Sequence, residues 1–488
     1  MLSARTVMGK SPLSRGPAES RPRLLMLATQ PFYPPNTGAR IRNYYLAREL
    51  AAHFDVTYVS FSEHIAIDNA FHLDAGRSID GIRVVPVPLP ARYGVRNLIL
   101  GAVGRKPVTV LNYTTRLMAQ TLERLLGEFD FDFVQMESIH LIAYMPVIRA
   151  AASNPIVTID WHNIESELMH RYAAAEKNPA RKTYARATAV KIERLERKVL
   201  RQFDAHIVVS ERDRTKLLRP APGAAIHLAE NGADIEGLSE EAIEAAHKEW
   251  EAESRSGGMD NGIPAHGSCE RRRLVFVGSM DYVANQRAVL HFAREVWPAV
   301  YFARPNLILT IVGRNPSKDV RELGSIPGIE VTGTVEDVRP YYREAVAAIV
   351  PLRIGGGSRL KIVEAMAAGV PVISTPLGAE GLDVESGTNI LLATSSAEFQ
   401  AAIGRLCEDA AERRRLSQAG RALAIEKYSW LGVGRRLAAM YAQIAKSRTS
   451  AGEEFQQPVF SDRATGVTGP LGLRRPDITV PARFGEAS

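Results

Sequence analysis

The chain has 488 residues, a length that favours two or three domains, and its 45% hydrophobic and 24% charged residues are ordinary for a globular protein. No apolar run is long enough to span a bilayer, and the two cysteines, Cys269 and Cys407, match no metal-binding or redox spacing. The net charge of +7 is dispersed without the aromatic interleaving of single-stranded nucleic-acid binders, so we expect no nucleic-acid partner. These features predict a cytoplasmic protein.

The first part of the chain predicts a leader and then an α/β domain. Residues 1–21 are basic and lack the apolar core of a signal peptide, so we expect a disordered leader. Over 22–236, short apolar runs alternate with helical stretches such as 40–54, a pattern typical of a doubly wound sheet. The predicted strands are 24–30, 56–61, 83–89, 133–137, 156–162, 205–210 and 226–231.

The densest basic stretch of the N-terminal half is residues 180–202, which is predicted to form an amphipathic helix. Such a helix could rest on an anionic membrane surface, which would bring the protein to the inner face of the membrane. Its Glu–Arg spacing favours the alternative, a solvated helix face, by about two to one on the charge pattern.

The alternation breaks over 237–272, where an acidic, helix-prone segment is followed by a stretch rich in Gly, Ser and charge, and we expect a linker. A second α/β domain is predicted over 273–428, a C-terminal helix packing back on the first domain over 429–446, and a disordered tail over 447–488. Its predicted strands are 274–280, 307–313, 329–333, 347–352, 371–376 and 389–393. The fold class is therefore α/β, with two Rossmann-like doubly wound domains facing a central cleft suited to a large polar ligand.

The segment 353–382 carries the strongest chemical signal. Gly355, Gly356 and Gly357 follow a predicted strand and Ser358 is placed to cap a helix that begins at Arg359 and is stopped by Gly369. A helix start beyond the carboxyl end of a parallel strand is a favourable site for phosphate.

The side chains of this helix suit a nucleotide. Arg359 and Lys361 bring positive charge to its first turn, and Glu364, about one turn further, could accept hydrogen bonds from a ribose diol. The alternative is structural, with Lys361 and Glu364 as a surface ion pair and Arg359 as a solvated charge. Neither the dinucleotide fingerprint nor the Walker pattern follows a predicted strand, which disfavours a dehydrogenase and a P-loop ATPase.

The stretch GGGSRLKIVEAMAAGVPVIST resembles the donor-site signature of retaining GT-B glycosyltransferases, specifically glycosyltransferase family 4. Further segments resemble that family in order and spacing over about 22–446, and the HNIES and GGGSRLK variants look most like members associated with exopolysaccharide synthesis. These segments are PPNTGARIRNYYLAREL, DWHNIESELMHRY, VVSERDRTKL, ENGAD and LVFVGSMDYVANQRAV.

The resemblance implies roles for single residues. Glu364 matches the carboxylate that binds the donor ribose, and Gly38 falls in the loop that approaches the donor phosphates. His162 matches a histidine that contacts the transferred sugar. A packing or surface role is the alternative for His162, since the chain has 11 histidines, but the preceding strand and a cap-like Asn163 favour the site.

Two positions depart from the family pattern. Gly356 stands where the first of two paired glutamates is usual, and Ser279 and Asn285 stand where an arginine and a lysine usually grip the diphosphate. Arg359 and Lys361 could supply that charge, while Gly355, Gly356, Gly357, Ser358 and Ser279 would contact the donor through their backbone and hydroxyl groups.

The resemblance implies a glycosyltransferase of the hexosyltransferase class that moves a sugar from a nucleotide-diphospho-sugar to a hydroxyl acceptor, a glycan or lipid-linked saccharide, with retention of configuration. No cofactor or metal is expected, and the catalytic set would be His162, Arg359 and Lys361. Alternatives are a nucleotide-sugar sensor or scaffold without turnover, an epimerase or phosphorylase on the same fold, and a membrane-surface adaptor that uses the 180–202 helix.

Overall fold

The computed structural model describes residues 21–62, 78–89, 106–256, 273–354 and 359–454, with isolated positions between 94 and 104. The leader before residue 21, the Gly/Ser-rich stretch 257–272, the glycine loop 355–358 and the tail after 454 lie outside the described residues. The chain forms two compact units, Met1–Ala442 and Gln443–Ser488, and the first contains both sheets.

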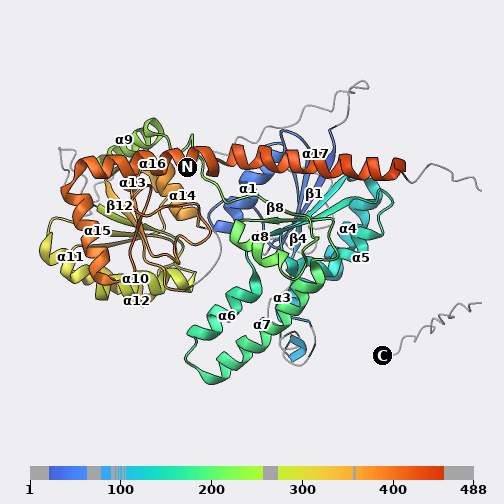
Figure 1. The fold of residues 1–488 in the computed structure, drawn as a ribbon, viewed down its shortest axis with the longest axis horizontal. Coiled ribbons are helices and arrows are strands. Elements are labelled where there is room, and N and C mark those ends of the chain that lie inside the picture. The colour runs from blue at the N-terminus through green and yellow to red at the C-terminus, as the bar shows by residue number, and fades with distance from the viewer. Residues whose placement is uncertain are drawn as a thin grey trace, which may run out of the picture. The chain divides into compact units, whose positions relative to one another are not determined.

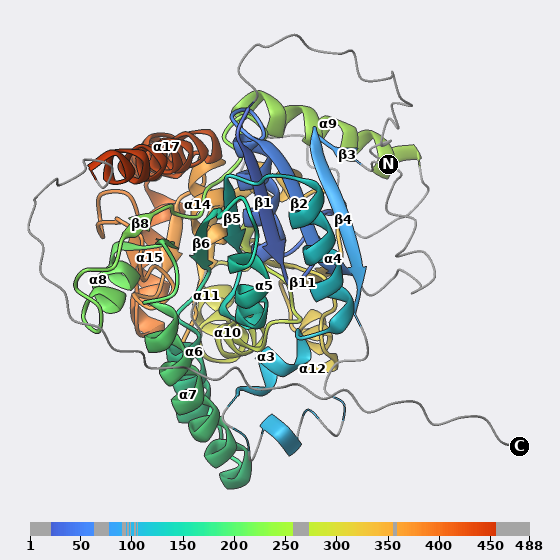
Figure 2. The same ribbon diagram turned by 90° about the vertical axis from the view of Figure 1, so that its right-hand side faces the viewer.

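The first sheet has eight strands in the order β3-β4-β2-β1-β5-β6-β7-β8, and we call residues 21–236 the N-lobe (Figures 1 and 2). All its pairings are parallel except that of β3 with β4. Central β1 is buried from Leu24 to Ala28, as expected for a strand covered on both faces. Its strands are β1 (Arg23–Ala28), β2 (Asp55–Ser62), β3 (Ser78–Ile79), β4 (Ile82–Pro88), β5 (Phe133–Met136), β6 (Ile156–Trp161), β7 (Ala205–Val208) and β8 (Ile226–Leu228).

Helices connect and cover these strands, and several begin at side-chain caps. Thr37, Thr115 and Ser210 each accept a hydrogen bond from a backbone N–H in the first turn that follows. The helices of the N-lobe are α1 (Gly38–Leu50), α3 (Val108–Asn112), α4 (Arg116–Glu128), η2 (Ile139–Tyr144), α5 (Met145–Arg149), α6 (Glu165–Ala175), α7 (Pro179–Val199) and α8 (Glu211–Leu218).

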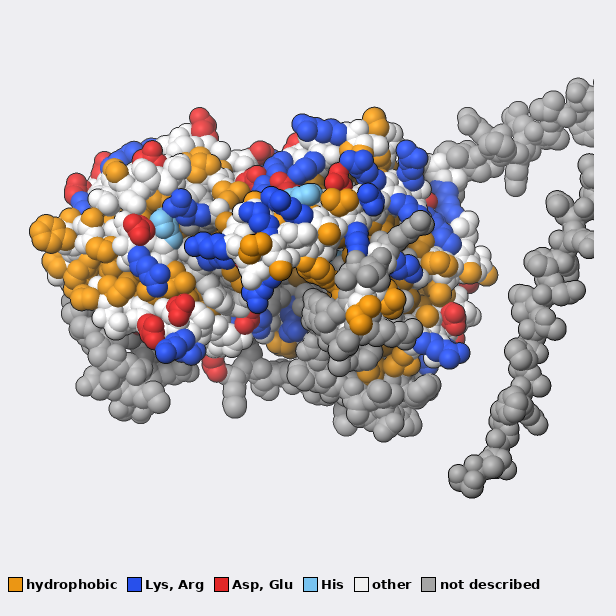
Figure 3. Space-filling view, turned by 90° about the horizontal axis from the view of Figure 1, so that it is seen from below, with side chains coloured by type: hydrophobic (Ala, Val, Ile, Leu, Met, Phe, Trp, Pro, Cys, Tyr) orange, Lys and Arg blue, Asp and Glu red, His pale blue; other side chains and the backbone are white. Residues whose placement is uncertain are grey.

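Helices α6 and α7 form a pair that extends away from the N-lobe sheet (Figure 1). The predicted helix at 180–202 is confirmed as α7, which buries Ala185, Ala189 and Ile192 and pairs Glu193 with Arg197 at 2.6 Å on its outer side. On the molecular face from which this pair extends, Lys and Arg side chains are more frequent than Asp and Glu side chains (Figure 3). Membrane contact by α7 stays a prediction. Among the described residues, no helix is both long and apolar enough to cross a membrane.

The second sheet has six parallel strands in the order β11-β10-β9-β12-β13-β14, and we call residues 273–428 the C-lobe. Its strands are β9 (Arg273–Val277), β10 (Ile308–Val312), β11 (Ile329–Gly333), β12 (Ala345–Val350), β13 (Val372–Ser374) and β14 (Leu391–Leu392). Its helices are α10 (Val283–Glu295), α11 (Trp297–Ala303), α12 (Lys318–Arg321), η3 (Glu322–Ser325), α13 (Arg339–Arg343), α14 (Leu360–Ala367), α15 (Ser396–Glu408) and α16 (Ala410–Tyr428).

These two parallel sheets confirm the predicted fold class, and every predicted strand is present. The short β3 was not predicted. Within the stretch predicted as a linker, α9 (Glu240–Ser256) packs against α13, and Glu244 bonds Arg343 at 2.7 Å.

The last helix, α17 (Trp430–Glu454), runs past residue 446, where the sequence led us to expect its end. Tyr441 on this helix contacts the N-lobe sheet. Its hydroxyl lies 2.9 Å from that of Thr158 and donates to Gln135, and its ring packs against Phe54 and Phe133.

Helix α14 follows the glycine loop, and its bounds correct one prediction. The helix begins at Leu360 with Arg359 as the N-cap residue, one position later than expected, and Arg359 makes no side-chain cap bond. The predicted stop at Gly369 is confirmed. Gly369 has φ +67° and donates to Met366 O, while Val370 donates to Ala365 O, the pattern of a Schellman end.

Candidate active site

Lys361 lies at the carboxyl end of β9, together with the residues that follow that strand. Its Nζ is 2.7 Å from Asn285 Oδ1 and 4.3 Å from the centre of the Phe276 ring. The Asn285 amide in turn donates to the carbonyl of Ser279 at 2.7 Å. Lys361 therefore brings its ammonium group to the residue that replaces the family lysine at position 285.

Gly278 leaves room for this approach. A Cβ atom built on Gly278 would lie 2.8 Å from Lys361 Nζ and 2.9 Å from Asn285 Nδ2, closer than side chains pack. The absence of a side chain lets Lys361 cross from α14 to the end of β9.

Lys361 and Glu364 are both half-buried charged groups. Burial and the nearby Arg359 lower the pKa of Lys361 to about 7, and burial raises the pKa of Glu364 to about 7. The structure gives no ion pair between them, so the predicted surface pair is wrong. Within the described part of the chain, the Glu364 carboxylate has no hydrogen-bond or ion-pair partner. Burial, and then the charge of Glu364, raise the pKa of Tyr342, whose buried hydroxyl also lacks a hydrogen-bond partner.

Arg314, which the sequence did not single out, reaches the predicted donor residue Ser279. It follows β10, the neighbour of β9, and its Nε donates to Ser279 Oγ at 3.2 Å. Asp281 forms an ion pair with Arg314, with 2.9 Å between the carboxylate oxygen and the guanidinium nitrogen. The signal available in the sequence was its place after a predicted strand next to the first strand of the domain.

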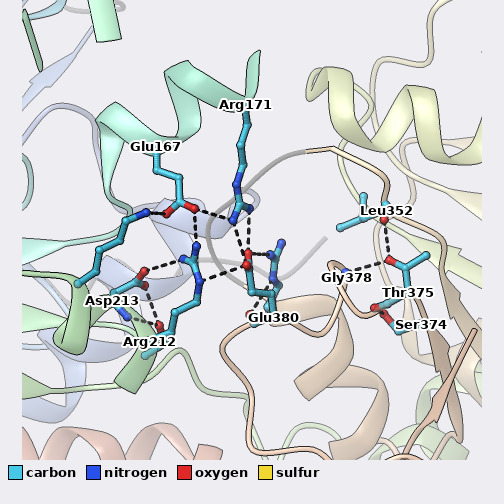
Figure 4. Close-up of polar contacts among 12 residues, drawn as sticks. Glu167, Arg171, Arg212, Asp213, Leu352, Ser374, Thr375, Gly378 and Glu380 are labelled. Atoms are coloured by element: carbon cyan, nitrogen blue, oxygen red, sulfur yellow. Dashed lines mark hydrogen bonds and ion pairs between the residues drawn. The ribbon is translucent and has the colours of Figure 1, made fainter. Parts of the chain in front are cut away.

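Arg359 has a different partner from Lys361. Its guanidinium bonds the carbonyl of Glu380 at 3.1 Å and the Glu380 carboxylate at 3.3 Å (Figure 4). The predicted pair of phosphate-binding cations is therefore split in this structure, because Arg359 turns toward the loop after β13 and Lys361 toward β9.

Glu380 connects the C-lobe to the N-lobe. Arg171 on α6 binds both carboxylate oxygens, at 2.8 and 2.9 Å, and Arg212 on α8 binds one at 3.1 Å (Figure 4). Glu167 also forms ion pairs with these two arginines and with Lys216. Because these residues lie on two lobes far apart in sequence, no local pattern could identify them.

A pocket lies at this seam between the lobes. Asn163, next to the predicted site residue His162, and Arg359 both line it. Asn163 does not cap α6, as the sequence suggested, since Ile164 is the N-cap residue. Instead, Asn163 Oδ1 is buried and has no hydrogen-bond partner among the described residues.

His162 follows β6 at the carboxyl edge of the N-lobe sheet. Its Nε2 lies 3.1 Å from Oε2 of Glu137, a buried residue that follows the neighbouring strand β5. Burial raises the pKa of Glu137, and its hydrogen bond to His162 opposes that rise. Gln135 donates to the other Glu137 oxygen at 2.6 Å, so the carboxylate is fixed from both sides.

Asp160, Glu137 and His162 bring their ligand atoms within 4.8 Å of one another, a cluster that the sequence did not predict. Asp160, however, accepts hydrogen bonds from Arg42 at 2.8, 3.0 and 3.1 Å, and Glu137 is held by Gln135 and His162. A cation there would face the buried guanidinium of Arg42, so the donor set does not fit a metal site.

Gly38 is the first residue of α1, directly after its Thr37 cap. Gly38 thus lies in the first turn of a helix of the N-lobe, whereas the resemblance placed it in a loop, and its contact with the donor phosphates stays a prediction. Gly355, Gly356, Gly357 and Ser358 lie outside the described residues, so their part in the site stays a prediction.

Comparison with known proteins assigns the two lobes. Residues 37–232 match the family model described as "Glycosyl transferase 4-like domain", and residues 271–409 match the one described as "Glycosyl transferases group 1". Both lobes therefore match glycosyltransferase domain families, and the chain has the GT-B fold. The first match covers the strands of the N-lobe sheet except β1, and the second covers the whole C-lobe sheet.

The chain resembles two curated mannosyltransferases over part of its length. It is 30% identical over 183 residues to a phosphatidyl-myo-inositol mannosyltransferase of Mycobacterium leprae, which covers 36% of this chain and 48% of that one. It is 34% identical over 185 residues to an MMP alpha-(1->4)-mannosyltransferase of Mycolicibacterium hassiacum, covering 35% and 43%. The chain therefore spans less than half the length of these curated relatives.

Solved structures agree in fold over nearly the whole chain. Sucrose-phosphate synthase from Thermosynechococcus elongatus has a TM-score of 0.63 at 17% identity, covering 87% of this chain and all of that one. HepE from Anabaena in complex with UDP-glucose has a TM-score of 0.52 at 15% identity, covering 88% and 99%. At these identities the likeness concerns the fold alone.

Proposed function

We propose that this glycosyltransferase transfers a sugar from a nucleotide-diphospho-sugar to a hydroxyl group of an acceptor, with retention of configuration. The observation that carries the proposal is the position of Lys361 and Glu364 at the start of α14. Both are half buried, and neither has an oppositely charged partner among the described residues. A charge kept in such a place is well suited to a ligand that supplies the missing partner.

In the proposed complex, Lys361 binds the diphosphate of the donor and Glu364 accepts hydrogen bonds from its ribose. Gly278 and the predicted loop from Gly355 to Ser358 would allow the phosphates to approach the backbone, and Ser279 with Arg314 would border them. As the leaving diphosphate gains charge during transfer, Lys361 would stabilise it most strongly in the transition state. Arg359 would act through Glu380, by holding the end of the loop.

His162 and Gly38 would serve the N-lobe side of the reaction. Because His162 Nε2 is engaged by Glu137, its Nδ1 is the ring atom left to meet the transferred sugar. The leaving phosphate would help to deprotonate the acceptor, so the proposal requires no separate base, metal or cofactor.

The relatives support the donor class. Two matched relatives are named mannosyltransferases, and solved structures of HepE are described in complex with UDP and with UDP-glucose. A further relative is described as a protein in the cps region of Klebsiella pneumoniae. We propose a glycan or lipid-linked saccharide as acceptor, exopolysaccharide or cell-envelope synthesis as the setting, and cytoplasmic placement with contact of α7 to the inner face of the membrane.

The test is a panel of UDP- and GDP-sugars titrated into the full chain and into Glu364→Ala, with binding followed by ligand-observed NMR. We expect selective binding of one donor, weakened about tenfold to a hundredfold in Glu364→Ala because hydrogen bonds to a charged group are lost. Slow release of free sugar in the same tubes would mark turnover. Glu336→Ala is the surface carboxylate control. Equal binding by wild type and Glu364→Ala would contradict the assignment of Glu364, and binding without sugar release in the presence of acceptors would contradict the transferase.

A further inference from the structure

Three arginines and three carboxylates line the pocket at the seam. They are Arg171, Arg212 and Arg359, and Glu167, Asp213 and Glu380. Burial acts against ionisation of Glu167, but hydrogen bonds from Arg212 and Lys216 lower its pKa to about 2. If the Glu380 carboxylate turns out of the pocket, the three arginines exceed the two remaining carboxylates by one charge.

The arginines are arranged for an oxyanion. Arg171 binds Glu380 with two parallel hydrogen bonds of 2.8 and 2.9 Å, and Arg212 adds a third of 3.1 Å (Figure 4). A planar guanidinium that binds two oxygens in this way recognises carboxylate and phosphate equally well. Glu167 fixes both arginines from the N-lobe side, so they keep this geometry when Glu380 leaves.

Glu380 is positioned to give way to a ligand. It lies in the loop after β13, directly before Gly381, which has φ +86° and approaches Ser210 of the N-lobe so closely that a Cβ would lie 3.0 Å from the Ser210 Cβ. Its side chain is one quarter exposed. Because Glu380 lies in a loop, turning its side chain away disrupts no helix or strand.

A second polar group in the pocket, the side-chain carbonyl of Asn163, lacks a hydrogen-bond donor. Asn163 lines the pocket, and its buried Oδ1 accepts no hydrogen bond from any described residue. A buried carbonyl oxygen without a donor costs about 1–3 kcal/mol, so a hydroxyl from a ligand would be favourable there. A sugar that carries an acidic group offers both the oxyanion and the hydroxyl that would match these side chains.

We propose that this pocket is the acceptor subsite and that it binds a saccharide carrying a phosphate or carboxylate. Arg171 and Arg212 bind the anionic group in place of Glu380, and Asn163 accepts a sugar hydroxyl. The inference rests on the proposed function, because it names the acceptor of that same transfer.

The experiment titrates the full chain with sugars that differ in charge, by calorimetry at low ionic strength. The anionic probes are glucose 6-phosphate, mannose 6-phosphate and glucuronate, which separate phosphate from carboxylate, and the neutral probes are glucose and mannose. We expect at least one anionic sugar to bind about tenfold or more tightly than its neutral counterpart, and Arg171→Gln to remove most of that difference. Arg197→Gln, which removes an arginine on the outer side of α7, should leave it unchanged.

The variant Glu380→Gln distinguishes a ligand-binding site from ion pairs that only hold the two lobes together. If Glu380 competes with the ligand, its neutral variant binds the anionic sugar about tenfold more tightly than wild type. If the arginines serve only to hold the lobes together, Glu380→Gln binds it no better, and this result overturns the proposal. Equal binding of charged and neutral sugars, or binding of neither, overturns it as well.

Asn163→Ala tests the hydroxyl contact, with an expected loss of about fivefold to tenfold for the sugar phosphate and none for inorganic phosphate. Titration of UDP and GDP into the same samples keeps the two proposals apart. Nucleotide binding without a preference for anionic sugars would overturn only the acceptor inference. Absence of nucleotide binding would overturn the proposed function instead.

Discussion

The N-lobe and the C-lobe both bury charged groups beside the carboxyl ends of their strands, but the partners of these charges differ between the two lobes. In the N-lobe, Arg42 and Asp160 are almost completely buried and form a bidentate pair, and Glu137 is held by Gln135 and His162. In the C-lobe, Lys361 rests on an amide and an aromatic ring, and Glu364 has no partner among the described residues.

We interpret the paired charges of the N-lobe as structural and the unpaired charges of the C-lobe as ligand-binding. In a buried ion pair the attraction between the charges offsets much of the cost of their desolvation, and removing one member leaves the other charge buried without compensation. A buried charge without a counterion is held at a cost in stability, which a bound ligand of opposite charge or with hydrogen-bond donors can offset. We therefore expect substitutions in the N-lobe set to reduce stability and those in the C-lobe set to reduce binding.

The largest effect is expected for Arg42→Met, which leaves the Asp160 carboxylate buried without a cation. The free energy of unfolding should fall by about 3–5 kcal/mol in urea denaturation. Adding Asp160→Asn to this variant should restore part of the loss, because no buried charge then remains unpaired. If Arg42→Met were as stable as wild type, the framework role of this pair would be wrong.

Lys361→Met should show the opposite behaviour. Affinity for the preferred nucleotide sugar should fall about thirtyfold, because a charged hydrogen bond to the diphosphate contributes about 2 kcal/mol. The free energy of unfolding should change by no more than about 1 kcal/mol, since the ammonium group is already poorly solvated in the folded chain. Calorimetry and urea denaturation measure the two quantities. Lys318→Met, on the exposed side of the same lobe, is the matched control, and a large loss of stability in Lys361→Met with unchanged affinity would make Lys361 a framework residue.

The smallest effect concerns pH. Donor binding needs Glu364 ionised and Lys361 protonated, and the pKa of each is about 7 in the free protein. Affinity should therefore fall below pH 7 as Glu364 gains a proton and fall above pH 7 as Lys361 loses one, with a slope of at most tenfold per pH unit on either side. Calorimetry with a nucleotide sugar from pH 5.5 to 8.5 measures this profile. Glu364→Gln should flatten the acid side and Lys361→Met the alkaline side, whereas a profile unaltered by both variants would exclude these two groups as its origin.

The sequence by itself determined the architecture and pointed to the residues of the proposed donor site. Apolar runs of strand length, separated by helices, leave few alternatives to two sheets of mainly parallel strands. All the predicted strands are present because an apolar run of strand length is a local property of the chain. The helix after the glycine loop and its end at Gly369 were equally predictable, since a left-handed residue at a helix end favours glycine. The family motifs pointed to His162, Lys361 and Glu364 for the same reason: each lies directly beyond a strand or in the first turns of a helix.

Only the tertiary structure decided which charges meet. The chain has 61 basic and 54 acidic residues, so sequence cannot assign Arg359 to Glu380, Lys361 to Asn285 or Arg42 to Asp160, which are 118 positions apart. The start of α14 shifted by one residue because capping depends on a local backbone turn that many side chains tolerate. A side chain's partner depends on how strands order within a sheet and on how two lobes meet, and both are set by the packing of the whole core.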